Sequence, residues 1–492
     1  MKEESEVDTS ALASQTEQYA DMAFQKWPSL METFQSDSVL AKTRGVMPED
    51  VAALGQMLHQ WETYQRFCEQ NGTLADLGTL PKHALEIITA DFGTSILPHI
   101  ASVQPIKERM GIVYYKTVKA TKARGNVAVG DTLISPFAPP NKASDGTKNY
   151  PEGYAGEKVV ETKSLSTYNT TAFKVPGTVG ASTIRPRSLE LYITVSNVLM
   201  KGIDDGAGNI LGNGFFGSIE YVSADGGTTA PQMSLTFAST VTETLTVIYA
   251  TDFEESGYVP EVNFQIDYTE ISAEVFALTQ ATGMFKAFEF QNRFGQSAEE
   301  MIARDLTGAL NLELGNVAIS RLIASAVGSV DFYMGVPQYI SYAEHMQQLK
   351  ALITKASSTI LNNAGRGYVN YLICGSTAAG VVATLPGWTQ QIVDTPGSNI
   401  WGTLDGMTVI RAPHIDDYAI YPVYKGKGGF DTPLVWSPYM PLVVSKTLQD
   451  IENILKNRAV AAVWGGLKVV APTFVTKIQL IDAAYTTPAW QP

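Results

Sequence analysis

The stretch from residue 365 to residue 474 constrains the fold more than any other part of the chain, because helix and strand signals alternate in it at short intervals. Its runs of apolar and small residues predict these elements in order: a buried strand at 368–374, a helix at 376–385, a turn at 404–407, a strand at 408–411, a strand entered through Pro438 and Pro441, and strands at 460–464 and 467–471. Glycines that fall at the predicted turns, where a positive φ is expected, are Gly365, Gly367, Gly402 and Gly406. No catalytic motif accompanies these elements, so their order is the main clue.

Three other segments have the residue spacing of helices. In 48–70, between Pro48 and Asn71-Gly72, apolar residues recur on one face: Val51, Leu54, Met57, Leu58, Trp61, Tyr64 and Phe67. Ser297 and Glu300 have capping-box spacing and open a helix to about residue 326, which at ~1.5 Å per residue is about 45 Å long. The third helix spans 342–363. The first 104 residues as a whole are expected to be helical.

Two long strands are separated by a loop and a β-rich segment. Residues 111–120 predict an outgoing strand, and 135–156, rich in Pro, Gly, Asn and Lys, predict a loop. Residues 262–279 predict a returning strand, whose apolar positions change phase and indicate a bulge near Thr269-Glu270.

Residues 162–252, between these strands, predict a separate β-module. Apolar and polar residues alternate with a period of two at 189–195, 233–237 and 245–249, which is typical of strands with one buried face. Asp225-Gly226-Gly227 predicts a hairpin turn between strands. Several short strands at this spacing suggest a small sandwich.

Composition narrows the possible functions. The chain has 492 residues, of which 45% are hydrophobic, so it can bury a sizeable core and form more than one domain. Only 17% of the residues are charged, which suits a surface in contact with many neighbours, although a weakly charged monomer would have the same composition. A net charge of -14 does not neutralise phosphates, so sequence-specific nucleic-acid binding is not expected.

The cysteines and the first residues favour a reduced cytoplasmic origin. Cys68 and Cys374 are the only cysteines, and they form neither a metal-site spacing nor a disulfide framework. The first residues lack the basic and apolar regions of a signal peptide, and no apolar run is long enough to span a bilayer.

Each motif that could carry chemistry has a simpler explanation. The glycines of 206–212 resemble a phosphate loop, but strand patterns lie on both sides, so a turn is expected. Asp204-Asp205 could hold a cation beside that turn, and an exposed turn explains it as well. Residues 425–429 lack the first glycine and the Ser/Thr of a P-loop and predict a solvated loop.

The titratable residues do not converge in the sequence. No pair of histidines has the spacing of a helical zinc site; they are His59, His83, His99, His345 and His414. Cys374 lies in an apolar strand and is expected to be a core thiol. Glu299-Glu300 and Asp416-Asp417 are adjacent pairs, whose side chains point in different directions. We therefore assign no catalytic residue, no cofactor-binding residue and no metal ligand.

Two parts of the sequence resemble the major capsid proteins of T4-like tailed phages, which have the HK97 capsid fold. One is the order of elements in 365–474, and the other is the run Ser95-Ile-Leu-Pro-His-Ile-Ala-Ser-Val-Gln-Pro-Ile106, which leads into a strand in that family as well. The resemblance covers 84–124 and 262–476. It implies an α+β, HK97-like fold with an inserted β-sandwich-like module, in six parts: an N-terminal helical arm at 1–104, the outgoing strand and tip of the E-loop at 105–161, the module at 162–255, the returning strand and the peripheral domain with its long spine helix at 256–335, an axial domain at 336–435, and C-terminal peripheral strands at 436–492.

The resemblance also implies a function. The chain would be a structural protein, not an enzyme, that forms hexamers and pentamers of an icosahedral or prolate head around phage DNA. Its partners would be other copies, a scaffolding protein, a prohead protease, a portal and decoration proteins, with no membrane. It would be made in the cytoplasm of the bacterial host and reside in the virion. Some HK97-fold shells cross-link an E-loop lysine to a neighbour's asparagine, and Lys142 and Lys148 lie in the corresponding region.

Precursors in the family lose an N-terminal segment to a protease that cuts after glutamate, two residues beyond an apolar residue. Leu30-Met31-Glu32 fits this pattern near the family's position, so cleavage after Glu32 is a hypothesis. Phe67-Cys68-Glu69 fits it too, but lies in a predicted helix, where protease access is poor.

Two alternatives remain open from the sequence. The chain could be another virion or compartment protein, such as a tail sheath or an encapsulin-like shell, and electron micrographs would distinguish tubes from closed shells. It could also be an enzyme of an unrecognised class, against which the lack of a convergent titratable cluster weighs.

Overall fold

The computed structural model divides the chain into two compact units, Met1–Lys116 with Ile266–Pro492, and Thr117–Gln265. The boundaries fall inside the outgoing and returning strands that the sequence predicts. The six-part division is finer than this split and stays a prediction. The structure describes residues 9–71, 84–122, 127–134, 157–164, 168–174, 184–195, 198–221, 232–251, 259–294, 298–337, 340–364, 366–391, 399–426, 431–445, 448–449 and 455–482.

The first unit begins with a helical segment, as the sequence predicts. Its elements are α1 (Thr9–Lys26), α2 (Pro28–Asp37), α3 (Val39–Thr43), α4 (Pro48–Gln70), α6 (Ala84–Thr94), α7 (Leu97–Ile100) and a short strand, β1 (Ala101–Val103). The bounds of α4 are as predicted, and the Asp50 carboxylate accepts a hydrogen bond from the backbone N–H of Met47 before its first turn. Phe67, however, is 60% exposed, and Cys68 is buried instead. Cys68 follows the buried Trp61 by two helical turns, so it lies on the same face.

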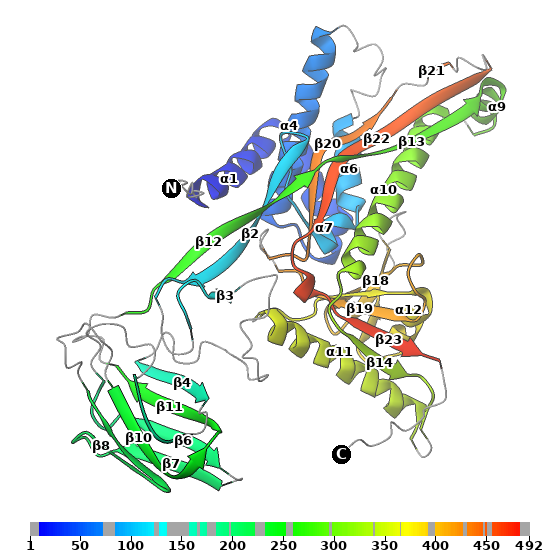
Figure 1. Cartoon of the computed structure of the whole chain (residues 1–492). Helices are drawn as coiled ribbons and strands as arrows, with labels where there is room; N and C mark the ends of the chain where they lie inside the picture. The colour runs from blue at the N-terminus through cyan, green and yellow to red at the C-terminus, as the bar shows by residue number, and fades with distance from the viewer. Residues whose placement is uncertain are drawn as a thin grey trace. The chain divides into compact units, whose positions relative to one another are not determined.

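A sheet with the strand order β1-β20-β22-β13 follows, and β21 also pairs with β22. The bounds are β20 (Leu434–Val444), β22 (Lys456–Val469), β13 (Glu274–Gly283) and β21 (Leu448–Gln449). The long helix α10 (Ala298–Ala324) packs against β22 and β13 (Figure 1). Leu306, Leu310 and Leu314 lie on its buried face, and Gly315 lets Ile96 approach, because a Cβ there would lie 3.0 Å from its Cγ2 atom. The predicted cap Ser297 lies outside the described residues.

The strand β22 corrects one prediction. It is continuous, whereas the sequence predicts two strands at 460–464 and 467–471. Gly465 and Gly466 lie inside it, and both are positions of close approach. A Cβ on Gly465 would overlap the ring of Trp436, and one on Gly466 would lie 2.7 Å from the Cγ1 atom of Ile271. The glycine pair therefore admits neighbouring side chains and does not mark a turn.

The prolines of β20 correct a second prediction. Pro438 and Pro441 lie inside the strand and not at its start. The register between β20 and β22 shifts between Pro438 and Met440, and again between Met440 and Val443. Proline has no N–H group for the ladder, so a strand accommodates it at such irregularities.

The returning strand breaks later than predicted. β12 (Val262–Ser272) and β13 meet at Ala273 and not at Thr269-Glu270. Ile271 and Ala273 are buried. Beyond the break the phase changes again, so that Phe276 and Leu278 pack on the core below α10 while Val275 is exposed. β12 also pairs with β2 (Met110–Ala120), and β2 with β3 (Thr132–Ile134), which confirms the two predicted long strands.

The other large sheet of the first unit has the order β14-β23-β19-β15-β18-β17-β16. Its bounds are β14 (Ser329–Tyr333), β23 (Lys477–Ile481), β19 (Ala419–Val423), β15 (Tyr371–Cys374), β18 (Met407–Arg411), β17 (Ile400–Leu404) and β16 (Trp388–Gln390). The helices α11 (Tyr342–Ala364) and α12 (Ser376–Ala383) bury their apolar faces in its core, and a short 3-10 turn, η2 (Pro472–Phe474), adds Phe474. Both helices and β15 confirm the predictions within a few residues.

The turn between β17 and β18 confirms the predicted hairpin. Asp405 and Gly406 both have positive φ, 49° and 83°, as a two-residue hairpin of this hand requires. Gly367 also has a positive φ, of 95°. The prediction is wrong for Gly402, which lies in β17, where a Cβ would overlap the ring of Trp388. Gly365 lies outside the described residues.

The second unit contains an eight-stranded antiparallel sheet with the order β4-β11-β6-β7-β8-β9-β10-β5. Its bounds are β4 (Lys158–Ser164), β5 (Tyr168–Lys174), β6 (Glu190–Val195), β7 (Val198–Asp204), β8 (Asn209–Gly212), β9 (Phe215–Ile219), β10 (Gln232–Val241) and β11 (Thr244–Ala250). The three predicted alternating strands correspond to β6, β10 and β11. The predicted sandwich of two sheets is wrong, because one hydrogen-bonded sheet supplies the inner residues of a single core. The turn expected at Asp225-Gly226-Gly227 lies outside the described residues.

The residues at which the chain enters and leaves this sheet are bonded to each other and form its base. The backbone N–H of Thr251 donates to the carbonyl oxygen of Glu157 at 2.9 Å. Ile184 forms an isolated bridge with Thr251, and the Arg185 guanidinium pairs with the Glu157 carboxylate at 3.1 Å. The first and last residues of the sheet are therefore held side by side.

Candidate assembly surfaces

The glycine-rich segment of the second unit is a turn, as predicted. It joins β7 to β8, and Gly206 and Gly208 both have positive φ. The buried Asp204 carboxylate accepts hydrogen bonds from the backbone N–H groups of Arg187 and Gly206 and from the hydroxyl of Tyr221. These bonds use its oxygens within the protein, so Asp204 holds the turn.

Lys425 corrects the prediction of a solvated loop at 425–429 for its first residue, and 427–429 lie outside the described residues. The Lys425 ammonium group donates to the carbonyl oxygen of Pro98, which also accepts a hydrogen bond from the Arg44 guanidinium. Arg44 is paired in turn with the Asp50 carboxylate at 2.9 Å. Burial, with the Arg44 charge as a further cause, lowers the pKa of Lys425 to about 7. The residue therefore ties this point of the chain to the N-terminal helices. No sequence pattern indicated this, because the partners lie more than three hundred positions away.

Three other residues singled out from the sequence, His99, His345 and Cys374, are held within the fold. Burial, followed by the charges of Arg44 and Lys425, lowers the pKa of His99 to about 3, so this histidine is neutral. The ring of His345 stacks on Phe332, and its Nε2 atom lies 2.7 Å from the carbonyl oxygen of Tyr333. Cys374 is fully buried, and burial raises the pKa of its thiol. Within the described ranges, no three His, Cys, Asp or Glu residues form a group that could hold a metal ion.

Several exposed apolar residues lie on the long strands. On the pair β2–β12, Met110 is 69% exposed and Phe264 is 62% exposed. Other exposed apolar residues of the two strands are Ile112, Val262 and Tyr268. A strand normally hides one face, so such residues indicate surfaces that another chain covers.

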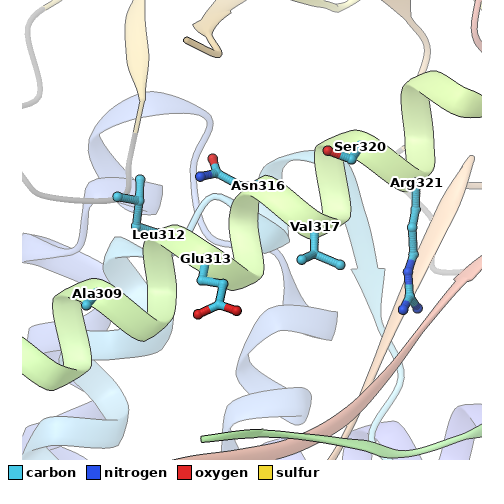
Figure 2. Close-up of a pocket in the computed structure, with 7 residues that line it drawn as sticks. All are labelled: Ala309, Leu312, Glu313, Asn316, Val317, Ser320 and Arg321. Atoms are coloured by element: carbon cyan, nitrogen blue, oxygen red, sulfur yellow. The ribbon is translucent and has the colours of Figure 1, made fainter. Parts of the chain in front are cut away.

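A shallow groove of about 400 Å³ runs along α10. Figure 2 shows Leu312, Asn316 and Ser320 on one side of this face and Glu313, Val317 and Arg321 on the other. Arg321 donates to Glu274 of β13 and to the carbonyl oxygen of Leu467 of β22, so it fixes the helix to the sheet. The side-chain oxygen of Asn316 is buried and accepts no hydrogen bond within the described part of the chain.

The second unit has an apolar row across its outer face. Ile203 in β7 lies directly opposite Leu211 in β8, and Leu211 lies opposite Phe216 in β9. All three side chains are at least half exposed. Because cross-strand neighbours on one face are in contact range, the row forms a continuous apolar strip.

Sequence reasoning missed the helix α9 (Met284–Phe294), which lies between β13 and α10 in the chain. Phe285 and Phe288, one helical turn apart, are exposed. The spacing of its phenylalanines is a helical signal that could have identified it. No described helix is long and apolar enough to cross a membrane.

Extended apolar strands and strips at the surface, together with titratable groups that are used within the fold, define a structural protein that associates with other chains. A sequence model of one family, described as "Major capsid protein Gp23", matches residues 78–487. This match spans most of the sequence, and the chain therefore belongs to the Gp23 major capsid protein family of T4-like phages. It is a structural capsid protein of the virion, and the family is not enzymatic.

Comparison with solved structures finds phage capsids and related particles. The capsid of Myoviridae phage XM1 is 11% identical and has a TM-score of 0.30, with 67% of this chain and 88% of that chain covered. The capsid of an empty GTA particle is 10% identical with a TM-score of 0.33, covering 79% and 90%. A virus-like particle from Pyrococcus furiosus is 13% identical with a TM-score of 0.29, covering 44% and 81%. No curated protein sequence matches the chain.

Proposed function

We propose that the chain adopts an HK97-like capsid fold and assembles into hexamers and pentamers of a closed phage head. In this proposal β2 and β12 are the arms of the E-loop, α10 is the spine helix, and the sheet from β14 to β16 with α11 and α12 belongs to the axial domain. The eight-stranded sheet of the second unit forms the inserted module. The six domains follow the boundaries proposed from the sequence.

The observation that carries this proposal is the exposure of apolar residues on β2 and β12. A hairpin with Met110, Phe264 and Tyr268 in water is unfavourable for an isolated chain. When it lies on a neighbour, each Å² of buried apolar surface contributes about 25 cal/mol, so modest contacts add up over many subunits. A heterologous contact of this kind closes into a ring when its rotation permits.

The remaining partners follow from the same proposal. A scaffolding protein, a prohead protease, a portal and decoration proteins would act on the shell, and synthesis would take place in the bacterial cytoplasm. The net charge of -14 supports a wall that does not bind the enclosed DNA tightly. A cross-link through Lys142 or Lys148 is not part of the proposal, because both lysines lie outside the described residues.

Electron microscopy of the purified full chain tests the assembly. Closed shells with hexameric units are expected, whereas tubes would indicate a sheath. Deletion within 136–156, at the tip of the proposed E-loop, should leave a folded subunit but impair shell formation. A deletion variant that assembles like the parent would refute the tip as a strap between subunits.

A further inference from the structure

One edge of β13 is unpaired. β22 pairs with β13 along its whole length, from Glu274 to Gly283, and no described strand pairs with the other side. Every residue of β13 is exposed or half exposed. Backbone N–H and C=O groups of a strand point alternately to its two edges, so about half of those in β13 face water. Such an edge is a template for another strand.

The other described edges in this chain are short or carry charges. β1, β3 and β16 have three residues each. β14 carries Asp331, β4 carries Lys158 and Lys163, β12 carries Asp267 and Glu270, and β5 ends in Lys174. In β13, residues 275–283 contain no charge and no proline, which makes this the longest charge-free run on a described edge. The chain therefore protects its other edges against strand addition and leaves this one open.

We infer that the open edge of β13 accepts an extended segment from a second copy of this chain, which adds to the sheet as a further strand. The inference rests on the proposed assembly of copies into a shell. Only an extended backbone satisfies alternating donors and acceptors along ten residues. β13 also continues β12, separated from it by Ala273 alone, so the edge is continuous with the apolar hairpin that is proposed to lie on a neighbour.

The side chains of the exposed face allow close approach. Val275, Ala277 and Thr279 stand on this face, and all are small or β-branched. Thr279 lies directly opposite Val460 in β22, and Ala277 lies opposite Ala462. An incoming strand beside Thr279 would therefore extend an existing row of cross-strand pairs.

Hydrogen exchange of the full chain tests the inference directly. Amide exchange in 274–283 is measured by mass spectrometry in the dilute, unassociated protein and in whatever assembly the concentrated protein forms. Association should slow exchange at about half of these amides by about tenfold or more, because their N–H groups become bonded. Unchanged exchange in an assembled sample would overturn the inference.

A pair of lysine substitutions distinguishes docking at the edge of β13 from docking on the face of the sheet. Thr279→Lys places a charge on the edge strand, and Val460→Lys places the same charge on the same face one strand further in. Thr279→Lys should abolish the protection and raise the concentration needed for assembly about tenfold, while Val460→Lys should retain the protection. Equal loss in both variants would overturn docking at the edge in favour of the face. Thermal melting of the dilute variants verifies that each one folds.

Electron micrographs report on shell closure, and hydrogen exchange reports on strand addition, so the two proposals can fail independently. Closed shells in electron micrographs without protection of β13 would overturn the edge inference alone. Protection of β13 in tubes or open sheets would support it and overturn the closed shell. A chain that stays monomeric at every concentration would overturn both.

Discussion

Single residues with unusual backbone angles carry the turns of this chain. Gly406 has a φ of 83°, and a Cβ there would meet no atom within 4 Å, so its requirement for glycine comes from the backbone alone. Gly380, on the exposed side of α12, would also have open space around an added Cβ, but it has no positive φ. Substitution of these two glycines therefore tests the effect of backbone conformation alone, because an added Cβ meets no atom at either position.

Alanine at these two positions should act in opposite directions. Gly406→Ala should destabilise the protein by about 1 kcal/mol, because an L-residue pays a steric penalty at positive φ. Gly380→Ala should stabilise it by roughly 0.5–1 kcal/mol, since alanine is the better helix former. Urea denaturation of both variants measures the difference. Equal effects would contradict the backbone argument.

Asp91 makes the stability of the first unit depend on pH. Its carboxyl group, on α6, accepts a hydrogen bond from the Asn311 amide of α10. Burial raises its pKa to about 7, while the hydrogen bond opposes the shift. As pH rises from about 4 to 7, the unfolded chain ionises at this position and the folded chain does not, so stability falls. The contribution is fully present below the unfolded pKa and lost above about 7.

Asp91→Asn should remove this dependence. The variant should melt close to the parent at pH 4 and at a higher temperature than the parent at pH 8, because the amide never ionises. Asp331→Asn, on the exposed face of β14, is the matched control for the loss of one negative charge. Parallel melting profiles of parent and Asp91→Asn between pH 4 and pH 8 would contradict the assignment.

At the scale of elements, the sequence predicted correctly those helices and strands whose bounds depend on residues within the segment itself. The bounds of α4 and α11 follow from apolar spacing and from end signals that lie within the segment itself. The errors arise where a distant segment decides. Gly465-Gly466 suggested an interrupted strand, because the ring of Trp436 that fills the space belongs to another part of the sequence. No pattern near Lys425 could reveal Pro98 and Arg44.

Gly465→Ala should therefore be costly. The added methyl group would overlap the Trp436 ring, and such overpacking typically destabilises by about 1–3 kcal/mol. Combining it with Trp436→Phe should cost less than the sum of the two single substitutions, because the smaller ring makes room. Denaturant unfolding of the four-member cycle measures this coupling. Strict additivity would place the two residues out of contact.

The hypothesis of cleavage after Glu32 meets a structural obstacle. Glu32 lies within α2, and Met31 beside it is fully buried while Leu30 packs against the same core. Both candidate sites, Glu32 and Glu69, are thus helical, so helical structure does not favour one over the other. The family match also begins at residue 78, beyond both. Intact mass of the protein from mature particles determines whether the segment is removed.

Cleavage at this site should require local unfolding of α2. Met31→Ala removes a buried side chain and should speed cutting after Glu32 by a glutamate-specific protease about tenfold or more. Glu69, which is exposed at the end of α4, provides an internal reference that should change little. Rapid cutting after Glu32 in the parent protein would show that α2 does not protect the site.

At the scale of the molecule, the two units differ in how their cores are built. The second unit buries its own cluster, and its base is closed by the bond between Thr251 and Glu157. Deletion of 158–250, with two glycines joining Glu157 to Thr251, should leave the melting temperature of the first unit nearly unchanged. Calorimetry should show the loss of one transition. Loss of both transitions would mean that the first unit depends on the insert.

The strand pairing of the first unit has a consequence for protein synthesis. β1 pairs with β20, β13 with β22, and β14 with β23, so each large sheet of this unit takes a strand from beyond residue 433. At about 5–20 residues per second, the ribosome needs tens of seconds between the first and last of these strands. The second unit, whose strands are close in sequence, can fold during that interval. A nascent chain cannot present either large sheet of the first unit in finished form, so only a released subunit is competent to join a growing shell.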